Sequence, residues 1–305
     1  MKKILYASAI YPTKFFDTFL RDTLATLTHQ TYKTFDILLF LDCVGESTLA
    51  PAINHLRSHI NGEVFTLGQS TPTLNPTQIR LTLIKEAYKR GYDYVFFGDF
   101  DETSDLNRIQ ATLEQIGDFD FGFTSFYPTD FSLRRLSDID FHASRHTPAT
   151  ISYPLALLDR NFIGLGNLAL SLKKPLPLDG DISHIKAFDW FLGTLMLLHG
   201  FQGKRIEGTF LNYRQHTESY VGMDRPLDAH SLKLGLEVKK AHYAHFSPYD
   251  GLFGTKLEEM LALDDYLSAQ KNQVKYIQIV NENFDPKQMC WWENIKTLKE
   301  LEKWI

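Results

Sequence analysis

The stretch that decides our interpretation of the fold is Tyr92–Asp105, which reads YDYVFFGDFDETSD. Its mostly apolar run, Tyr94–Gly98, follows a glycine and predicts a short buried strand. Two carboxylates, Asp99 and Asp101, come directly after that strand. Ligands bind at the carboxyl edge of an open α/β sheet, so we expect both side chains at the mouth of a ligand site.

The D-x-D pattern by itself allows two interpretations. Two carboxylates one residue apart suit a hard divalent cation and the phosphate oxygens that accompany it. Aspartate is also common in a polar turn after a strand, and so short a pattern is frequent by chance. The surrounding strands, helices and motifs therefore decide between a metal site and an ordinary turn.

The composition indicates a globular protein. The chain has 305 residues, of which 44% are hydrophobic and 23% charged, which is enough for one large domain or a domain with an appendage. The formal net charge is −5 and the lysines and arginines form no run, so we expect no nucleic-acid partner. Cys43 and Cys290 lie far apart without metal-type spacing, which favours a reducing compartment.

The sequence predicts no transmembrane segment. The N-terminus, MKKILYASAIYP, resembles a signal peptide, but its apolar run is short and leads into Tyr-Pro, so we interpret it as a first strand. The longest apolar run, Trp190–Leu198, is too short to cross a bilayer. Residues 290–305 place apolar side chains on one helical stripe, which favours packing on the main domain over membrane-surface contact. We expect a cytoplasmic protein, with peripheral contact at the inner face of the membrane as the alternative.

Strands and helices alternate through the first part of the chain. Near-continuous apolar strands joined by helices are typical of an α/β fold with a mostly parallel sheet and helices on both faces. The expected strands are 3–10, 36–41, 64–67, 94–98 and 119–126, and the expected helices are 15–30, 47–60, 76–90 and 103–116.

The alternation ends near residue 127. Residues 128–150 are polar and irregular, and a loop of that length inside a domain is usually functional or mobile. The later elements that we expect are a flexible segment at 161–171, a helix at 184–199, extended segments at 202–215 and mainly helix from 227 onward.

Several motifs share the spacing of one enzyme family. Residues 20–32, on the first expected helix, fit the pattern L-x-x-T-L-x-x-L-x-x-Q-T-Y. Pro12 and Thr13 follow the first strand, Asp42 ends the second, Arg80 precedes the D-x-D strand, and Glu102 follows the D-x-D. With these motifs the first half of the chain resembles the family 2 glycosyltransferases, which have the GT-A fold.

The second half resembles that family more weakly. Asp189-Trp190 is similar to the catalytic acid motif, although Phe188 stands where the family has Glu. The segment Tyr213–His216, with Gly222 six residues on, is similar to the Y-R-x-H segment of many such enzymes. Leu41 replaces the first acid of an Asp-Asp pair that ends at Asp42. The Q-x-x-R-W motif of processive synthases is absent, so the resemblance is to the non-processive bacterial type.

The resemblance implies a fold and a division of the chain. A Rossmann-like GT-A domain would cover residues 1–222, with a nucleotide-binding half at 1–126 and an acceptor-binding half at 127–222. A helical C-terminal extension would cover residues 223–305.

The resemblance also implies an activity. The protein would be a metal-dependent, hexosyltransferase-like, inverting glycosyltransferase with Mg²⁺ or Mn²⁺ as its cofactor. Its donor would be a nucleotide-diphosphate sugar, UDP- in the first place, with dTDP- and GDP- as alternatives. Its acceptor would be a saccharide or a lipid-linked molecule, in the synthesis of a bacterial surface polysaccharide.

The main catalytic roles carry over residue by residue, each with an ordinary structural alternative. Asp101 would be the metal ligand, and Asp99 would face the ribose and a metal-bound water. His216 would complete the metal site or touch the diphosphate, or be a surface histidine. Arg214 would pair with phosphate, or form an ordinary salt bridge. Asp189 would be the general base, with a pKa raised by its apolar surroundings, or a helix N-terminal acid.

The remaining candidates for nucleotide-sugar binding lie at strand ends, on a helix and in the glycine-containing segment. Asp42 would accept a hydrogen bond from the base, and Arg80 would bind phosphate or base. Asn167, in the flexible segment with Gly164 and Gly166, suits close approach of a sugar to the backbone. The residues that would line the base pocket are Tyr11, Pro12 and Thr13. Asp179 and Asp181 are rivals of Asp189, but their Pro/Gly context indicates a turn and an N-cap.

Two other function classes stay open. DFDET also fits the D-x-D-x-T motif of haloacid dehalogenase-type phosphatases, in which Asp99 would be the nucleophile, Asp101 an acid and Ser125 the second-motif hydroxyl. That motif usually lies on the first strand of its fold, whereas three strands are expected before it here. The missing acids before Asp42 and Asp189 would also suit a non-catalytic nucleotide- or sugar-binding module.

Overall fold

The computed structural model describes residues 2–216, 226–283 and 291–304, and these form two compact units. Unit 1 consists of Met1–Tyr153, Phe162–Ser183 and Leu195–Arg214. Unit 2 consists of Pro154–Asn161, His184–Thr194 and Gln215–Ile305. Neither unit is continuous along the chain, and the division at residue 222 that the resemblance implies stays a prediction.

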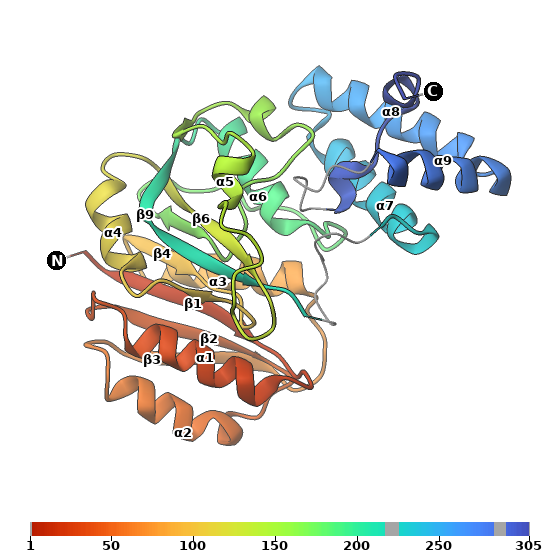
Figure 1. The fold of residues 1–305 in the computed structure, drawn as a ribbon. Helices are drawn as coiled ribbons and strands as arrows, with labels where there is room; N and C mark the ends of the chain where they lie inside the picture. The colour runs from red at the N-terminus through yellow and green to blue at the C-terminus, as the bar shows by residue number, and fades with distance from the viewer. Residues whose placement is uncertain (1, 217–225, 284–290, 305) are drawn as a thin grey trace. The chain divides into compact units, whose positions relative to one another are not determined.

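Unit 1 is built on one sheet of nine strands (Figure 1). The strands lie in the order β3-β2-β1-β4-β8-β6-β9-β5, and β7 also pairs with β9. Their bounds are β1 Ile4–Ile10, β2 Asp36–Asp42, β3 Val64–Gln69, β4 Tyr94–Phe97, β5 Thr103–Ser104, β6 Phe121–Thr129, β7 Thr150–Ile151, β8 Leu168–Ser171 and β9 Gly203–Arg214.

Most of this sheet is parallel. The strands β3, β2, β1 and β4 pair in parallel, and β6 pairs in parallel with β9. Strand β8 is antiparallel to both β4 and β6, so β6 and β9 point the same way as β4. Only the short strands β5, β7 and β8 oppose that direction. The mixed α/β fold with a mostly parallel sheet is therefore confirmed.

Helices cover the parallel part of the sheet on both faces. The side chains of Ile4 and Ile37, on one face, share an apolar core with Phe19 and Leu49 of α1 and α2. Helix α3 packs against β1, β2 and β4. The helices of unit 1 are α1 Phe16–Thr28, α2 Glu46–Arg57, α3 Pro76–Lys89, α4 Arg108–Gln115 and α5 Phe141–Ser144.

Local sequence explains where α3 begins and ends. The Asn75 side chain accepts a hydrogen bond from the Gln78 backbone N–H, the Gln78 side chain accepts one from the Asn75 N–H, and Pro76 opens the helix. After α3, Gly91 has φ +68°, a conformation that costs glycine little. The chain therefore turns sharply into β4, whose end carries the D-x-D.

The expected elements differ from the structure in two regions. The helix expected over 103–116 begins only at Arg108, because Thr103 and Ser104 pair with β9 instead. The expected strand 119–126 extends as β6 to Thr129, and the expected loop 128–150 contains α5 and ends at β7. Both differences depend on pairing or packing with residues far along the chain, which local periodicity does not report.

Unit 2 is mainly helical, as expected for the residues after 227. Its core contains Trp190, Tyr243, Phe253, Met260 and Tyr276, all at most 1% exposed. None of the helices in the described parts of the chain has both the length and the apolar character needed to span a membrane. The elements of unit 2 are η1 Pro154–Leu157, the first residues of α6 Phe188–Leu198, α7 Ala229–Phe246, α8 Gly251–Tyr266, α9 Gln270–Glu282, η2 Trp291–Asn294 and α10 Leu298–Leu301.

Candidate active site

The D-x-D of unit 1 lies in a tight turn after β4. The Glu102 backbone N–H donates to the Asp99 carbonyl at 3.2 Å, which closes the turn over residues 99–102. Strands β1, β2 and β3 run parallel to β4, so Tyr11, Asp42 and Gln69 leave the sheet at the same carboxyl edge. The structure thus brings the D-x-D and the candidate base-pocket residues to one rim of the sheet.

Residues 20–32, which carry the helix signature, hold this turn in place by hydrogen bonds. The Thr23 hydroxyl donates to the Phe100 carbonyl, between the two aspartates, at 3.2 Å. The Gln30 side chain donates to the Asp105 carbonyl at 3.0 Å and accepts from the Ile109 N–H at 3.3 Å. Both side chains are buried, Thr23 on α1 and Gln30 just after its end. Thr23 and Gln30 of the signature therefore form hydrogen bonds with backbone groups within and after the D-x-D.

Arg80 and Gly166 lie on two sides of Asp99. The Arg80 Nη2 is 3.4 Å from Asp99 Oδ1, and the two side chains are 29% and 32% exposed. A Cβ at position 166 would lie 3.2 Å from Asp99 Oδ2 and only 2.3 Å from Glu102 Oε2. A side chain at 166 would therefore require the buried Glu102 carboxyl group to move.

Glu102 is the buried member of this carboxylate group. It is 8% exposed, and burial, with the charges of Asp99 and Asp101, raises its pKa well above the usual range. Its Oε2 has no hydrogen-bond partner among the described residues. The crowding of three carboxyl groups therefore favours the neutral form of Glu102.

Arg108 is a site residue that sequence reasoning missed. Its guanidinium is 1% exposed and donates to the Leu168 carbonyl at 3.2 Å. Burial lowers its pKa, while the nearby Tyr6 and Glu102 raise it. An arginine on the sheet-facing side of a predicted helix is the signal that could have identified it.

Tyr11 faces the carboxylate group from the end of β1. Its ring packs edge-on against Phe100, with centroids 5.5 Å apart. Burial raises the pKa of Tyr11, and the charges of Asp101, Asp99 and Glu102 raise it further, in that order. The hydroxyl therefore stays protonated and can donate a hydrogen bond at neutral pH.

Asp42 is oriented by Gln69, a second residue that sequence reasoning missed. The Gln69 Nε2 donates to Asp42 Oδ1 at 2.7 Å, while its Oε1 accepts from the Thr73 and Leu74 N–H groups at 3.0 and 2.8 Å. One amide thus orients both Asp42 and the loop that leads into α3, which carries Arg80. A glutamine two residues after the predicted strand 64–67 was the available signal.

Pro12 and Thr13 form the turn between β1 and α1. Pro12 is exposed, and the Thr13 hydroxyl accepts from the Phe15 N–H at 3.2 Å. Asn167 lies beside Gly166 and is 2% exposed, and both polar atoms of its side chain lack a hydrogen-bond partner among the described residues. An unsatisfied buried amide is costly, so Asn167 suits a ligand or water that supplies the missing partners.

The structure places Arg214 in a buried ion pair. Its Nη2 contacts Asp22 Oδ2 of α1, and its guanidinium lies over the rings of Phe19 and Phe131 at 5.1 and 5.6 Å. This is the salt-bridge alternative that the sequence left open. His216 belongs to unit 2 and is partly buried, and its metal role stays a prediction. Gly222 lies outside the described residues.

Asp189 lies in the first turn of α6, in the part of that helix that belongs to unit 2. Its side chain is partly buried, so one edge stays accessible. Its Oδ2 accepts a hydrogen bond from Asn161 Nδ2 at 3.0 Å, and its Oδ1 accepts one from the Trp190 N–H at 2.9 Å. Its rivals Asp179 and Asp181 are exposed, and Asp181 accepts from the Ser183 N–H, as in a turn.

The donor set of unit 1 fits a hard cation that brings further ligands of its own. No cluster of three or more His, Cys, Asp or Glu side chains in the described parts of the chain could enclose a metal ion. Magnesium, however, is commonly bound by one or two carboxylates together with substrate phosphates and water. Asp101 and Asp99, beside the buried carboxyl group of Glu102, suit that incomplete kind of site.

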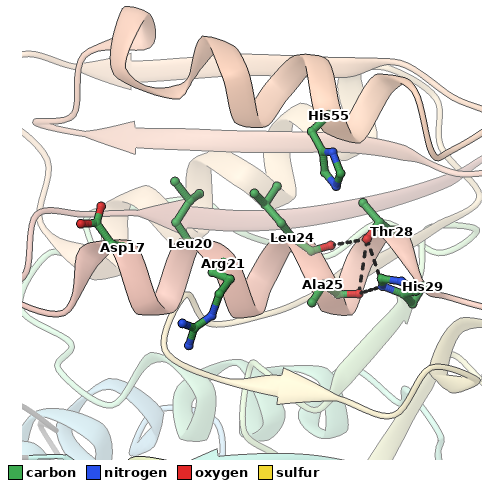
Figure 2. A pocket seen from close by; sticks show the side chains of 8 residues that line it. All are labelled: Asp17, Leu20, Arg21, Leu24, Ala25, Thr28, His29 and His55. Carbon is green, nitrogen blue, oxygen red and sulfur yellow. Dashed lines mark hydrogen bonds between the residues drawn. The ribbon is translucent and has the colours of Figure 1, made fainter.

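A pocket of about 390 Å³ is lined by side chains of α1, by His29 at its end and by His55 of α2. Figure 2 shows its lining, with α1 side chains from Asp17 to His29 and His55 from α2. Leu20 and Leu24 of the helix signature line it, whereas none of the predicted site residues does. These two leucines are therefore partly exposed rather than core residues.

Comparison by sequence finds no matching family model and no matching curated protein. Solved structures do match. The S. aureus TarS fragment 1–349 in complex with UDP-GlcNAc has a TM-score of 0.58 and 16% identity, over 85% of this chain and 71% of that one. The same fragment with UDP has a TM-score of 0.56 and 15% identity, over 85% and 70%.

A mannosyltransferase is a further structural neighbour. PcManGT from Pyrobaculum calidifontis, in complex with GDP-Man and Mn²⁺, has a TM-score of 0.53 and 13% identity, over 88% of this chain and 75% of that one. Identities this low establish a shared fold and not a shared substrate. The chain therefore has the GT-A fold of the glycosyltransferases that its sequence resembles.

Proposed function

We propose that this chain is an inverting glycosyltransferase that moves a sugar from a nucleotide-diphosphate sugar to a hydroxyl group of its acceptor. The observation that carries the proposal is the group of Asp99, Asp101 and Glu102 at the carboxyl rim of a GT-A sheet, beside Arg80 and Gly166. The structural neighbours with UDP-GlcNAc, UDP and GDP-Man support a nucleotide-sugar donor.

The donor diphosphate would be bound where negative charge is concentrated. Partly exposed Arg80 and buried Arg108 lie near the three carboxyl groups there, and a divalent cation with its phosphates would add positive charge beside Asp99 and Asp101. Asp101 with Asp99, and His216 by resemblance, would hold Mg²⁺ or Mn²⁺, which neutralises a leaving diphosphate when bound. The Mn²⁺ in the mannosyltransferase complex supports this cofactor class.

The remaining donor contacts follow from the rim of the sheet. The nucleotide base would lie where Asp42 ends β2 and where three residues follow β1, namely Tyr11, Pro12 and Thr13, with UDP as our first choice of nucleotide. Asn167 would offer its unsatisfied amide to sugar hydroxyl groups. Arg80 would contact phosphate. The buried pair with Asp22 favours a structural role for Arg214.

The transfer step needs a base and a leaving group. The Asp189 carboxylate would accept the proton of the acceptor hydroxyl as its oxygen attacks the anomeric carbon. The bond from that carbon to the diphosphate oxygen breaks on the opposite face, which inverts the anomeric configuration. The two hydrogen bonds to Asp189 orient it and favour its charged form.

The biological setting follows from the resemblance alone. The enzyme would make single transfers to a saccharide or lipid-linked acceptor, in the assembly of a bacterial surface polysaccharide or glycoconjugate on the cytoplasmic side of the membrane. Peripheral membrane contact would bring the enzyme to a lipid-linked acceptor.

Nucleotide binding tests the donor site directly. We expect UDP, GDP or dTDP at about 100 times its dissociation constant to stabilise the protein by about 2.7 kcal/mol in the presence of Mn²⁺, and much less without it. Asp101→Asn should remove the metal-dependent part of the thermal shift. The matched control is Asp179→Asn, since Asp179 is an exposed aspartate that is not a predicted metal ligand. Hydrolysis of p-nitrophenyl phosphate that Asp99→Asn abolishes would favour the phosphatase instead.

A further inference from the structure

We propose that Glu293, in the C-terminal segment of unit 2, is a positioning residue for the general base and acts through Asn161. The inference rests on the proposed function, because it takes Asp189 as the base. It concerns how that carboxylate is oriented, and it assigns a role in the reaction to the C-terminal segment. All the residues that carry it belong to unit 2.

Asn161 is the side chain that contacts the candidate base. Its Nδ2 donates to Asp189 Oδ2 at 3.0 Å. An ionised carboxylate can only accept, so the amide of Asn161 must present its nitrogen to Asp189. Asn161 is 3% exposed, so water competes little for this contact. The position of Asn161 therefore decides how one oxygen of Asp189 is oriented.

Glu293 in turn binds the backbone of Asn161. Its Oε1 accepts from the Asn161 N–H at 2.8 Å, across 132 positions of sequence. Glu293 is 1% exposed, and a buried hydrogen bond to a charged group is stronger than a neutral one. The carboxyl group of Glu293 thus fixes the residue whose side chain fixes Asp189.

Further contacts fix the segment that ends at Asn161. The Leu157 carbonyl accepts from Trp190 Nε1 at 2.6 Å, and the Leu158 carbonyl accepts from the Tyr243 hydroxyl at 3.1 Å. The Asp159 carboxylate accepts from the same hydroxyl at 2.9 Å and pairs with Lys256 at 3.3 Å. Nearly every residue from 157 to 161 is therefore tied to α6, α7, α8 or η2.

The aromatic rings beside Asp189 tie the same parts together. Trp190, which follows Asp189, lies between His242 of α7 at 3.4 Å and Trp292 of η2 at 4.0 Å between ring centroids. The ring planes are within 3° and 22° of parallel. Trp292 thus packs on the residue after the base, while its neighbour Glu293 binds the partner of the base. The C-terminal segment therefore contacts both Trp190, which follows Asp189, and Asn161, which donates a hydrogen bond to Asp189.

The loss of Glu293 should change the base rather than donor binding. We expect Glu293→Ala to lower kcat about tenfold, since a hydrogen bond to a charged group is of that size, and to leave the KM for the donor unchanged. A looser Asn161 stabilises the Asp189 carboxylate less, so the acid limb of the kcat profile should move to higher pH. Glu293→Gln, whose amide oxygen can still accept from the Asn161 N–H, should recover most of the rate.

Two further variants separate positioning from folding. Asn161→Ala removes the same hydrogen bond to Asp189 directly and should shift the acid limb in the same direction. Tyr276→Phe is the matched control, because the Tyr276 hydroxyl binds the Lys296 backbone of the same segment without touching Asn161. It should lower the thermal stability and leave the pH profile as it is. An equal shift in Tyr276→Phe would reduce Glu293 to a structural role and overturn the inference.

A titration of the Asp189 carboxyl group tests the inference without any substrate. Carbon-13 NMR of aspartate-labelled protein, with Asp189→Asn to assign the signal, should show a higher pKa for Asp189 in Glu293→Ala than in the wild type. An unchanged pKa overturns the inference even if transfer is observed. Full transfer by Asp189→Asn, in contrast, would refute the base assignment, so the two failures are distinguishable.

Discussion

The carboxylates of the two units are oriented by opposite means. In unit 1, Asp99, Asp101 and Glu102 crowd together, and burial and mutual repulsion raise the pKa of Glu102. In unit 2, Asp189 accepts hydrogen bonds from a neutral amide and a backbone N–H, beside a stack of aromatic rings. Unit 1 places three carboxyl groups close together, whereas unit 2 holds a single carboxylate with uncharged hydrogen-bond donors.

This difference matches two different tasks. A group of like charges is unfavourable by itself and becomes favourable when a cation joins it, so it suits ligand binding. A carboxylate held by neutral donors keeps one geometry through a proton transfer, which suits a general base. We therefore expect changes in unit 1 to alter binding and changes around Asp189 to alter the chemical step.

The largest expected effect tests this contrast at Asp189. Asp189→Asn keeps the shape of the side chain and removes its basicity, so kcat should fall about 10²–10⁴-fold, the size of a general-base contribution. Donor binding, measured by the nucleotide-dependent thermal shift, should be unchanged. A rate near that of the wild type would show that the base lies elsewhere.

The two units should also respond to pH in different windows. In unit 1, burial lowers the pKa of His142 to about 4, from 6.5, and its neutral Nε2–H donates to the Phe162 carbonyl at 3.1 Å. Between pH 6.5 and about 4 the unfolded chain binds a proton that folded His142 refuses. The free energy of unfolding should therefore fall by up to about 3 kcal/mol on acidification. His142→Gln, followed by urea unfolding across that window, should remove this fall.

Lys239 of α7 provides the counterpart in unit 2. Burial lowers its pKa to about 8, from 10.5, and its Nζ donates to the Ile295 carbonyl at 2.8 Å. Between pH 8 and 10.5 the unfolded chain binds more protons, so stability should rise with pH there. Lys239→Met should flatten this rise and leave the acid window unaltered. For unit 1, a fall in the free energy of unfolding between pH 6.5 and about 4 that is as large in His142→Gln as in the wild type would show that His142 does not cause it.

The smallest expected effect concerns the approach of the backbone to the carboxylates. A Cβ in Gly166→Ala would meet Glu102 Oε2 at 2.3 Å, so we expect a loss of stability of about 1–3 kcal/mol and weaker donor binding. Gly164→Ala is the matched control, because the nearest atom to its Cβ would be 3.9 Å away. Calorimetric titration of both variants measures the contrast. Similar donor affinities in the two would show that the close approach is not needed for binding.

Much of unit 1 could be predicted from local pattern. The apolar run before Asp99, the helical spacing of residues 20–32 and the Asn75–Gln78 box each depend on residues close in sequence. The helix expected from residue 103 begins as α4 only at Arg108, because Thr103 pairs with Asn212 of β9 instead. This difference shows the limit of such reasoning. A local pattern reports helical spacing and not the presence of a distant strand.

The sequence by itself determined the order of the elements and the emergence of Asp99 and Asp101 from a buried strand, since periodicity and strand ends are local properties. Only the tertiary structure decided which side chains meet these carboxylates and Asp189. The Gly166 backbone approaches Asp99 from a distant part of the chain, and Glu293 binds Asn161, the partner of Asp189, across 132 positions of sequence. Such contacts form when packed elements exclude water around polar groups, and no run of neighbouring residues encodes them.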